Sequence, residues 1–342
     1  MTELFLLNGR NPYKSRGGAA TWILNILPYF EKEFRVKLIY IPDSWLKLTF
    51  IPDRAKAFIF TFFYCLFHVK KESIVFSHSP EMGYIASFFT KKLIHLSHGN
   101  TNPMEYPTFK AGKLFKGFYN HIDKRLLKKS SLYYTVGKPL KNKIFINQPI
   151  LTLKELIPKS NDQRKNIIFA GRLEEVKNVE KLIQIYNKLP QKIKNEHSFI
   201  ICGTGSLIEK LKKTTSQLNL EKNIVFKGHL NYKDVLVEIS KAKLMVMASE
   251  FEGFPMSIAE ALSLGTPVVS SNVGSIETVI KNEYNGFCLQ KNESEEFYAN
   301  KWYEVLTHFD IFSANALASS KVFNPEIIYS KIKKDFKEKG IL

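Results

Sequence analysis

The chain has 342 residues, of which 44% are hydrophobic and 24% charged, and its formal net charge is +18. This composition is ordinary for a soluble globular protein, and the length is too great for one small core and suits two domains. The three cysteines, Cys65, Cys202 and Cys288, exclude a disulfide framework and a zinc spacing, which indicates a reducing, cytoplasmic environment.

Targeting and membrane-spanning segments are not expected. The first residues, MTELFLLNGRNP, lack the pattern of a signal peptide because Glu3 stands where positive charge belongs and the apolar run is short. The longest apolar stretch, Ala57 to Val69, has 13 residues, and a bilayer span needs about 20. We expect it to form a buried helix, or alternatively a helix at a membrane interface.

The positive charge is concentrated in the first half. Residues 1–150 contain 23 Lys and Arg against 9 Asp and Glu, whereas residues 151–342 contain 27 against 23. A one-sided basic field favours an anionic partner, which could be nucleic acid, an anionic membrane or a phosphorylated substrate. Nucleic acid is the weakest of the three because no recognised binding module is present and the aromatic residues fit buried positions.

Short apolar runs alternate with amphipathic stretches along the first half. We expect a helix from residue 17 to about 30, and strands at residues 4–7, 35–41, 74–77, 93–97 and 132–136. Such alternation predicts a parallel sheet with helices on both faces. Ligands bind beyond the carboxyl ends of such strands, so the ligand-side loops are Asn8–Ala19, Ser77–Met82 and Ser97–Met104.

A polar stretch with Pro149 and Pro158, residues 147–166, predicts an interdomain linker, after which a second alternating series begins. Its strands are expected at residues 167–169, 198–202, 224–226, 244–247, 268–270 and 286–288. The fold class is therefore α/β, with two Rossmann-like doubly wound domains, residues 1–147 and 148–322, facing across a cleft. Residues 325–340 have the pattern of a basic amphipathic helix.

The stretch from Ala248 to Gly265 combines an acidic loop with a helix that Pro255 should open and Gly265 should end. The free N–H groups at its start would form an anion site. Glu252 and Glu260 lie eight residues apart there. Glu260 belongs to an apolar helix and needs hydroxyl, amide or cation partners; the alternative is that both carboxylates are capping or surface residues.

Two cations and two glycine pairs also follow predicted strands. Arg172, which with Arg164 is one of two arginines after residue 150, and Lys177 suit a diphosphate, or else belong to a solvated loop. Each of the other candidates has either a structural role, in backbone geometry or core packing, or a role in ligand contact. They are Gly17 and Gly18 at a helix start, Gly203 and Gly205 in a G-x-G turn, and His78 and His98 at strand ends.

The segment EGFPMSIAEALSLGTPVV resembles the E-x7-E motif of the retaining, family-4-type glycosyltransferases, and GRLEEVKN resembles their GR…K motif. The resemblance implies the glycosyltransferase-B fold, with a C-terminal helix, residues 323–342, crossing back to the first, acceptor-binding domain. It implies a catalytic and donor-binding set: Arg172 and Lys177 on the pyrophosphate, Glu252 on the sugar, Glu260 on the ribose, His98 near the sugar, and backbone of Gly253, Phe254 and Met256 on the phosphate side.

The implied reaction is a metal-independent hexosyl transfer from a nucleotide-sugar donor, with retention of configuration, to a glycan or lipid-linked acceptor in cell-surface polysaccharide biosynthesis. No cofactor is expected, and no metal, because the chain contains no D-x-D pair. Two alternatives remain. One is a sugar-nucleotide epimerase of similar fold, which needs acid and base carboxylates in the first domain. The other is a non-catalytic, donor-binding subunit of a glycan assembly complex.

The segment from Lys110 to Lys129 carries seven Lys and Arg residues against Asp123 alone, with apolar residues at helical spacing. It predicts either a core-facing helix with a solvated basic face, or a helix that presses the first domain against anionic lipid. The second interpretation would make the protein peripheral on the inner face of the cytoplasmic membrane.

Overall fold

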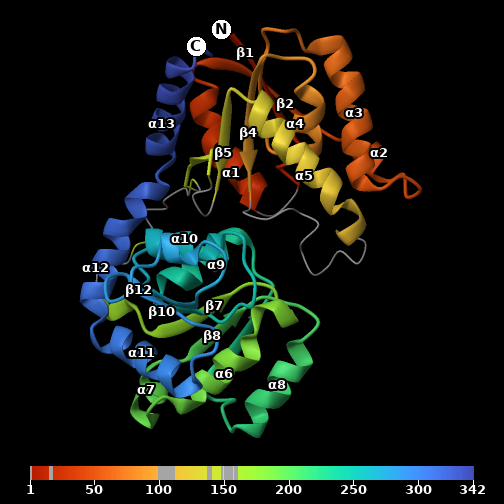
Figure 1. Ribbon diagram of the computed structural model, residues 1–342. Coiled ribbons are helices and arrows are strands. Elements are labelled where there is room, and N and C mark those ends of the chain that lie inside the picture. Colours follow the sequence, from red (N-terminus) through yellow and green to blue (C-terminus); the bar gives the residue numbers. More distant parts are fainter. Residues whose placement is uncertain are drawn as a thin grey trace. The chain divides into compact units, whose positions relative to one another are not determined.

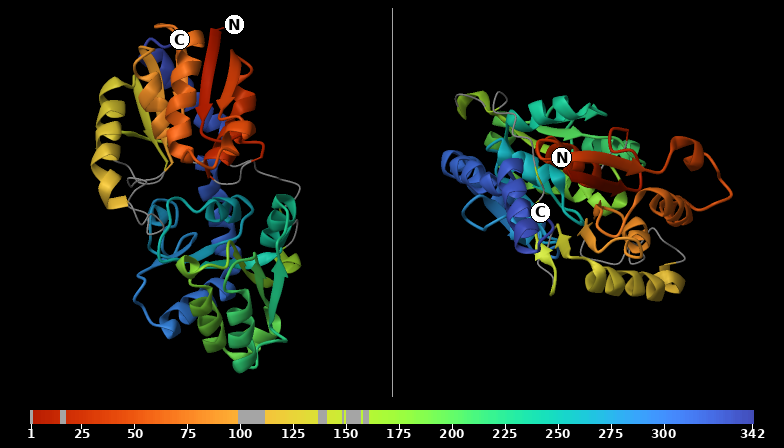
Figure 2. Two further views of the ribbon diagram at one scale, coloured as in Figure 1. Left: turned by 90° about the vertical axis from the view of Figure 1, so that its right-hand side faces the viewer. Right: turned by 90° about the horizontal axis from the view of Figure 1, so that it is seen from above.

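The computed structural model describes residues 2–14, 18–98, 112–136, 141–147, 149, 157 and 161–342. The chain divides into two compact units (Figures 1 and 2). Unit 1 comprises Met1–Pro149 together with Pro325–Leu342, and unit 2 comprises Ile150–Asn324. The C-terminal helix therefore belongs to the same unit as the N-terminal segment. Most of the predicted linker, and the candidate residues Gly17 and Lys110, lie outside the described residues.

Unit 1 is built on a parallel sheet with the strand order β2-β1-β3-β4-β5-β6 in its described residues. The inner strands β1, β3, β4 and β5 are largely buried because helices cover both faces of the sheet, whereas the edge strand β2 carries Arg35 and Lys37 and is only partly buried. The strands are β1 (Thr2–Asn8), β2 (Phe34–Tyr40), β3 (Ile74–Ser77), β4 (Lys92–Ser97), β5 (Leu132–Thr135) and β6 (Ile144–Phe145).

Alternate residues of these strands point to opposite helix layers. Val75 packs with α3 (Asp53–His68), α4 (Pro80–Ala86) and α5 (Gly112–Lys129). Phe76 lies on the other face, where its ring is 5.7 Å from that of Trp22 on α1 (Gly18–Phe30) and 6.5 Å from that of Phe336 on α13 (Pro325–Glu338). The short helix α2 (Asp43–Leu46) precedes α3.

Unit 2 repeats this architecture with the parallel order β12-β11-β10-β7-β8-β9. Its strands are β7 (Asn166–Ala170), β8 (Phe199–Cys202), β9 (Ile224–Gly228), β10 (Ala242–Met247), β11 (Val268–Ser271) and β12 (Gly286–Leu289). Its helices are α6 (Val179–Lys188), α7 (Gln191–Glu196), α8 (Ile208–Gln217), α9 (Tyr232–Ser240), α10 (Met256–Ser263), α11 (Glu295–Thr307) and α12 (Phe309–Ser319), with short 3-10 turns at η3 (Asn161–Gln163), η4 (Glu175–Lys177), η5 (Ile276–Thr278) and η6 (Ser320–Phe323).

The two strand orders fix where ligands can bind. In an open parallel sheet, the crevice lies at the carboxyl ends of the two strands between which the chain reverses its direction of winding. That point lies between β1 and β3 in unit 1, and between β7 and β10 in unit 2. The loops after these four strands are therefore the first places to look for a site.

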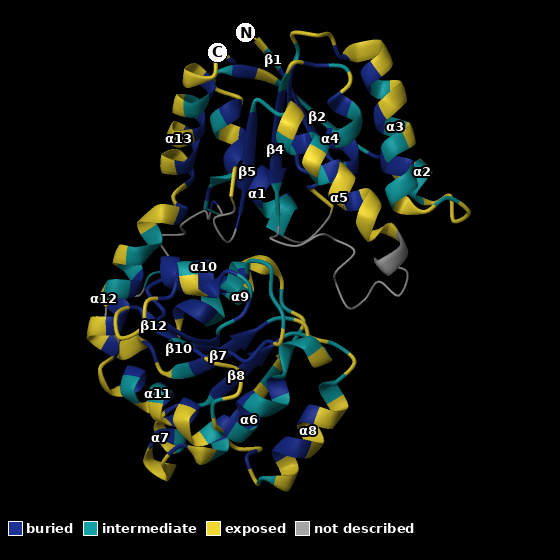
Figure 3. Cartoon of the chain, viewed as in Figure 1, coloured by how far each residue is buried: buried dark blue, intermediate teal, exposed yellow. Residues whose placement is uncertain are grey.

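The predicted fold class, two doubly wound Rossmann-like units, is confirmed. Two local expectations were wrong. Pro255 stands one residue before α10 rather than in its first turn. The apolar stretch in α3 is not a buried helix, since much of its outer face is exposed (Figure 3). Within the described residues, no helix is long and apolar enough to cross a membrane.

Candidate functional site

The switch point of unit 2 brings the predicted phosphate loop and the predicted sugar loop together. The loop after β7 carries Arg172 and Lys177, and the loop after β10 carries Glu250 and Glu252. The backbone N–H of Glu250 donates to the carbonyl of Val176 at 2.9 Å, which ties one loop to the other. The two loops, although far apart in the chain, therefore form one local site at the carboxyl ends of β7 and β10.

Lys177 and Glu252 form an ion pair in this site. The Nζ of Lys177 lies 2.5 Å from Oε1 of Glu252, and the Ser249 hydroxyl donates to the same carboxylate oxygen at 2.7 Å. The Lys177 side chain is 17% exposed and that of Glu252 is 9% exposed. Lys177 is therefore not part of a solvated loop, and its charge is held beside the carboxylate at the end of the sheet.

Arg172 is the exposed member of the set. Within the described residues, its side chain has no hydrogen-bond or ion-pair partner. Its charge contributes to lowering the pKa of Glu174, an effect that comes chiefly from hydrogen bonds donated by the Ser206 side chain and backbone N–H. The guanidinium is thus available at the strand end for an incoming anion.

Glu260 is buried in α10, whose apolar residues Ile258, Ala261 and Leu262 are fully buried. The pKa of Glu260 is raised to about 7 because the effect of burial outweighs the opposite effect of a hydrogen bond with Tyr232. The expectation that this carboxylate needs a hydroxyl partner is met by Tyr232 on α9.

The other arginine of this unit, Arg164, serves the fold. It is 2% exposed and donates to the Thr266 hydroxyl at 2.8 Å, to the Ala242 carbonyl at 3.2 Å and to the Leu264 carbonyl. Burial lowers its pKa to about 10. A cation on the last carbonyls of α10 is the favourable arrangement for a helix C-terminus, so Arg164 helps to fix the helix that carries Glu260.

The amino end of α10 has no side-chain cap, since Pro255 occupies that position. The Ile258 N–H donates to the Pro255 carbonyl at 3.1 Å, so the N–H groups that can face an anion are those of Met256 and Ser257. The preceding segment is held from outside the motif: the Ser275 hydroxyl donates to the Gly253 carbonyl at 2.7 Å, and the ring of Phe254 lies 6.2 Å from that of Phe323.

Gly203 and Gly205 are explained by packing within the unit. A Cβ atom on Gly203, whose φ is +149°, would lie 1.8 Å from the Gly171 carbonyl oxygen, and one on Gly205 would lie 2.2 Å from the Leu173 carbonyl oxygen. The G-x-G turn lets the loop after β8 press against the loop that carries Arg172, as the hydrogen bond from Leu173 N to the Thr204 carbonyl at 3.0 Å shows.

In unit 1, His98 and His78 meet at the carboxyl ends of β4 and β3. Nδ1 of His78 lies 2.9 Å from Nε2 of His98, and their rings stack with centroids 5.2 Å apart. Burial lowers the pKa of His98 to about 3 and that of His78 well below its ordinary value. Both rings are therefore neutral at neutral pH. Gly18 begins α1, and nothing lies within 4 Å of the position its Cβ would take.

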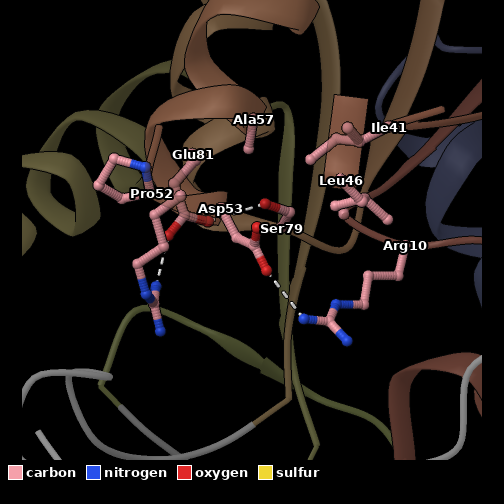
Figure 4. Close-up of a pocket in the computed structure, with 10 residues that line it drawn as sticks. Arg10, Ile41, Leu46, Pro52, Asp53, Ala57, Ser79 and Glu81 are labelled. Carbon is pink, nitrogen blue, oxygen red and sulfur yellow. Dashed lines mark hydrogen bonds and ion pairs between the residues drawn. The ribbon is translucent and has the colours of Figure 1, made fainter. Parts of the chain in front are cut away.

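The switch point of unit 1 holds a pocket of about 570 Å³ (Figure 4). Arg10 follows β1, and Ser79 and Glu81 follow β3; Asp53 and Arg54 come from the start of α3. Arg10 pairs with Asp53 at 2.9 Å, and Arg54 pairs with Glu81. Glu81 also accepts hydrogen bonds from Ser79 at 2.8 Å and Tyr119 at 2.6 Å.

Comparison with known proteins identifies the family. Residues 154–307, which include the whole unit 2 site, match the sequence profile of the family described as Glycosyl transferases group 1. The O-antigen biosynthesis glycosyltransferase WbnH of Escherichia coli is 27% identical over 331 residues, which cover 90% of this chain and 92% of that protein. Unit 2 therefore carries the sequence profile of this glycosyltransferase family, and the fold of the whole chain is the glycosyltransferase-B fold.

Two further likenesses bear on this transferase. The crystal structure of Anabaena Alr3699/HepE in complex with UDP has a TM-score of 0.70 and 17% identity, covering 99% of this chain and 100% of that chain. A UDP-Gal:alpha-D-GlcNAc-diphosphoundecaprenol alpha-1,3-galactosyltransferase of Escherichia coli is 30% identical over 168 residues, which cover 46% of this chain and 39% of that protein.

Several residues at the two switch points were missed in the sequence. Ser249 and Ser275 orient the sugar loop, and Gly274 allows its close packing, because a Cβ there would lie 2.1 Å from the Glu252 carbonyl oxygen. The signal for Gly274 was its place after the β11 run. Arg10 and Glu81 lay in predicted ligand-side loops without being singled out. No group of three or more His, Cys, Asp or Glu residues in the described part of the chain could hold a metal ion.

Proposed function

We propose that this glycosyltransferase moves a hexosyl group from a nucleotide-sugar donor, with retention of configuration and without a metal ion. The single observation that carries the proposal is the pairing of Lys177 with Glu252 at 2.5 Å, in the loop that leads into α10, whose amino end has no side-chain cap. A cation, a carboxylate and free backbone N–H groups at one strand end suit a ligand that carries both phosphate and hydroxyl groups.

In the proposed complex, the donor diphosphate lies against Arg172, Lys177 and the first turn of α10. A phosphate oxygen competes with Glu252 for the Lys177 ammonium, which leaves the carboxylate oxygens to accept hydrogen bonds from sugar hydroxyls. Glu260, one turn further along the helix, accepts hydrogen bonds from the ribose hydroxyls. These assignments follow the E-x7-E resemblance, and the burial and pairing of both carboxylates support them.

The chemical step breaks the bond between the anomeric carbon and the phosphate oxygen. The acceptor oxygen forms its bond to the same face of that carbon, and its proton passes to the departing phosphate. Negative charge grows on the leaving group, so fixed cations and N–H groups placed there supply most of the catalysis. Arg172 and Lys177 take the place of a divalent ion. Activity abolished by a chelator and restored by manganese would contradict this.

The acceptor is proposed to be a glycan or a lipid-linked glycan of cell-surface polysaccharide biosynthesis, bound by unit 1 on the cytoplasmic side of the membrane. Two relatives support this class: one is named for O-antigen biosynthesis, and the other for transfer to a GlcNAc-diphosphoundecaprenol. The pocket at the β1–β3 switch point offers Arg10 at its rim for an acidic or hydroxyl-rich acceptor.

A panel of nucleotide sugars tests the proposal. We expect slow release of the nucleoside diphosphate from one donor in the absence of acceptor, with faster release when the acceptor is supplied. Inversion at C2 would instead mark an epimerase, and binding without turnover a donor-binding subunit. The epimerase is the less supported alternative, because the carboxylates of the unit 1 pocket, Asp53 and Glu81, are both engaged in ion pairs rather than free for acid and base roles.

A further inference from the structure

The outer face of α3 is apolar. Ile59, Phe62, Phe63, Leu66 and Phe67 are 40%, 44%, 53%, 53% and 74% exposed, respectively. Their spacing of three and four residues places them on one side of the helix. The side that packs on the sheet instead buries smaller and polar residues: Lys56, Ala57, Thr61 and Cys65. The helix is therefore amphipathic with its more apolar side turned outward.

This apolar face continues onto the turn that follows α4 and onto α5. The ring of Phe62 lies 5.9 Å from that of Phe89, and the ring of Phe58 lies 5.9 Å from that of Phe118 on α5. Phe88 and Phe118 are themselves 58% and 44% exposed. We call the set of seven side chains the aromatic surface: Ile59, Phe62, Phe63, Leu66, Phe67, Phe88 and Phe118. A contiguous exposed apolar patch of this kind usually marks a binding surface.

Basic residues border the aromatic surface. Lys70 and Lys71 follow α3 directly, and the N–H of Lys91 donates to the Lys71 carbonyl at 2.9 Å, which places these two turns side by side. The Arg125 guanidinium lies 3.5 Å from the centroid of the Phe88 ring. Among the described side chains of α5, the exposed lysines are Lys116, Lys124, Lys128 and Lys129.

Acidic side chains are fewer than basic ones in the same region, where the exposed Glu72 follows Lys71. The segment from Ala57 to Phe67 contains no charged residue, and the α5 segment contains one acid, Asp123, which pairs with Lys143 at 2.9 Å. Apolar side chains surrounded by cations are complementary to a bilayer with anionic headgroups, where the rings enter the interface and the lysines remain at headgroup level. This charge pattern favours a lipid surface over a second copy of this basic chain, because two such faces would repel each other.

We propose that the aromatic surface and its basic border dock unit 1 on an anionic bilayer, with α3 lying in the interface. The amino end of the same helix carries Asp53 and Arg54, which line the pocket of unit 1. At a rise of about 1.5 Å per residue, Arg54 is roughly 20 Å along the helix from Phe67. Docking would therefore hold that pocket near the bilayer. Only this last step rests on the proposed function; membrane docking does not.

Flotation of the full chain with vesicles tests the proposal. We expect binding to vesicles of phosphatidylcholine with phosphatidylglycerol, and little binding to phosphatidylcholine alone. The double variant Phe63→Ser with Phe67→Ser should weaken binding by roughly tenfold or more, because it removes two exposed rings that would enter the interface. The matched control is Ile311→Ser on α12 of unit 2, where the side chain is 63% exposed; its binding should equal that of the unaltered chain.

A second variant and two further readouts complete the test. Lys124→Glu with Lys128→Glu should abolish the preference for anionic vesicles. Circular dichroism and donor hydrolysis in solution should be unchanged in all variants, which separates a failure of docking from a failure of the proposed reaction. Equal flotation of the Phe63 and Phe67 double variant and the unaltered chain would overturn the proposal. So would dimers in sedimentation that this double variant abolishes, since the aromatic surface would then join two copies.

Discussion

Lys177 and Glu252 lie 75 positions apart in the chain, and their ammonium and carboxylate groups are 2.5 Å apart. The pair joins the two motifs that resemble the pyrophosphate and sugar contacts of retaining glycosyltransferases. Both side chains are largely buried. Removing one partner of such a pair leaves the other charge without compensation, so the two residues act as a unit.

Replacing Lys177 with methionine should lower kcat/KM for the nucleotide sugar by about 10²–10³-fold, because a cation aimed at the leaving diphosphate is lost. Lys188→Met is the matched control, since Lys188 lies on the same unit and pairs with Glu296 in an exposed bridge. It should retain full activity. Steady-state release of nucleoside diphosphate measures the activity of both variants. Equal rates for the two would show that Lys177 does not act on the leaving group.

Donor binding should depend on the protonation of Glu260. Burial raises its pKa to about 7, and only the ionised carboxylate can accept hydrogen bonds from two ribose hydroxyls. Affinity should therefore increase as the pH rises towards 7, by up to about tenfold per pH unit below the pKa, and level off above it. Calorimetric titration with a UDP-sugar suits this test, because its esterified diphosphate does not titrate near pH 7. A pH-independent Kd would contradict the assignment.

The same carboxylate should shape stability. Its pKa in the folded chain lies above the ordinary value of 4.5, so between these values the folded state holds a proton that the unfolded state has lost. The contribution of Glu260 is then most favourable below about pH 4.5 and is lost as the pH rises to about 7. Relative to the unaltered chain, Glu260→Gln should gain up to about 3 kcal/mol in unfolding free energy between pH 5 and pH 8. Urea unfolding at both values measures this gain, and a constant difference between the proteins would contradict it.

Gly274 should be required for the position of the sugar loop. Gly274 and Gly340 both have a φ of +62°, but only at Gly274 would a Cβ collide, 2.1 Å from the Glu252 carbonyl oxygen. Both alanine variants pay the left-handed strain of about 1–2 kcal/mol. Gly274→Ala should in addition raise the donor KM or lower kcat by at least about tenfold, whereas Gly340→Ala should keep both constants. Equal kinetics in the two variants would mean that the loop tolerates the displacement.

His98 should depend on His78 for its orientation, since their nitrogens lie 2.9 Å apart. His98→Ala should reduce turnover more than His78→Ala, which we expect to cost about tenfold through misorientation. Asparagine can place a nitrogen or oxygen near the Nδ1 position, so His78→Asn should recover part of the loss. Because the pKa of His98 lies at about 3, its titration should leave no step in the rate between pH 5 and 8. Failure of the asparagine variant to recover activity would assign His78 to packing alone.

Arg10 should act on the acceptor and not on the donor. Its side chain is 66% exposed at the rim of the unit 1 pocket, and Asp53 retains Lys56 at 2.9 Å when Arg10 is removed. Arg10→Ala should therefore fold normally and raise the acceptor KM by roughly tenfold, with donor hydrolysis unchanged. Parallel assays with and without acceptor separate the two effects, and an unchanged acceptor KM would move the acceptor away from this pocket.

The sequence was most informative where burial on two faces leaves a continuous apolar run. The strand predicted at residues 74–77 has those bounds in the structure, and the loops of Arg172 and Glu252 meet because strand order places them at one switch point. Local patterns carry this information because parallel strands and βα loops repeat with little variation.

Other features depended on residues far away in the chain. Arg164 stands in a polar run that predicts a linker. In the structure it is buried and donates hydrogen bonds to Ala242, Leu264 and Thr266, which lie far along the chain. The apolar pattern of α3 predicted a helix, but it could not show that the face with the large apolar side chains points outward. Periodicity identifies the faces of a helix and not what surrounds them. The ion pairs of Arg10 and Arg54 likewise require partners that only the folded chain supplies.

The stereochemistry of donor hydrolysis tests the central claim most directly. With water as the acceptor, the full chain and an α-linked nucleotide sugar can be followed by proton NMR before the released sugar mutarotates. A retaining transferase should release the α anomer first, at a rate that a chelator leaves unchanged and that Lys177→Met strongly reduces. Initial release of the β anomer, or formation of the C2 epimer of the donor, would contradict the account.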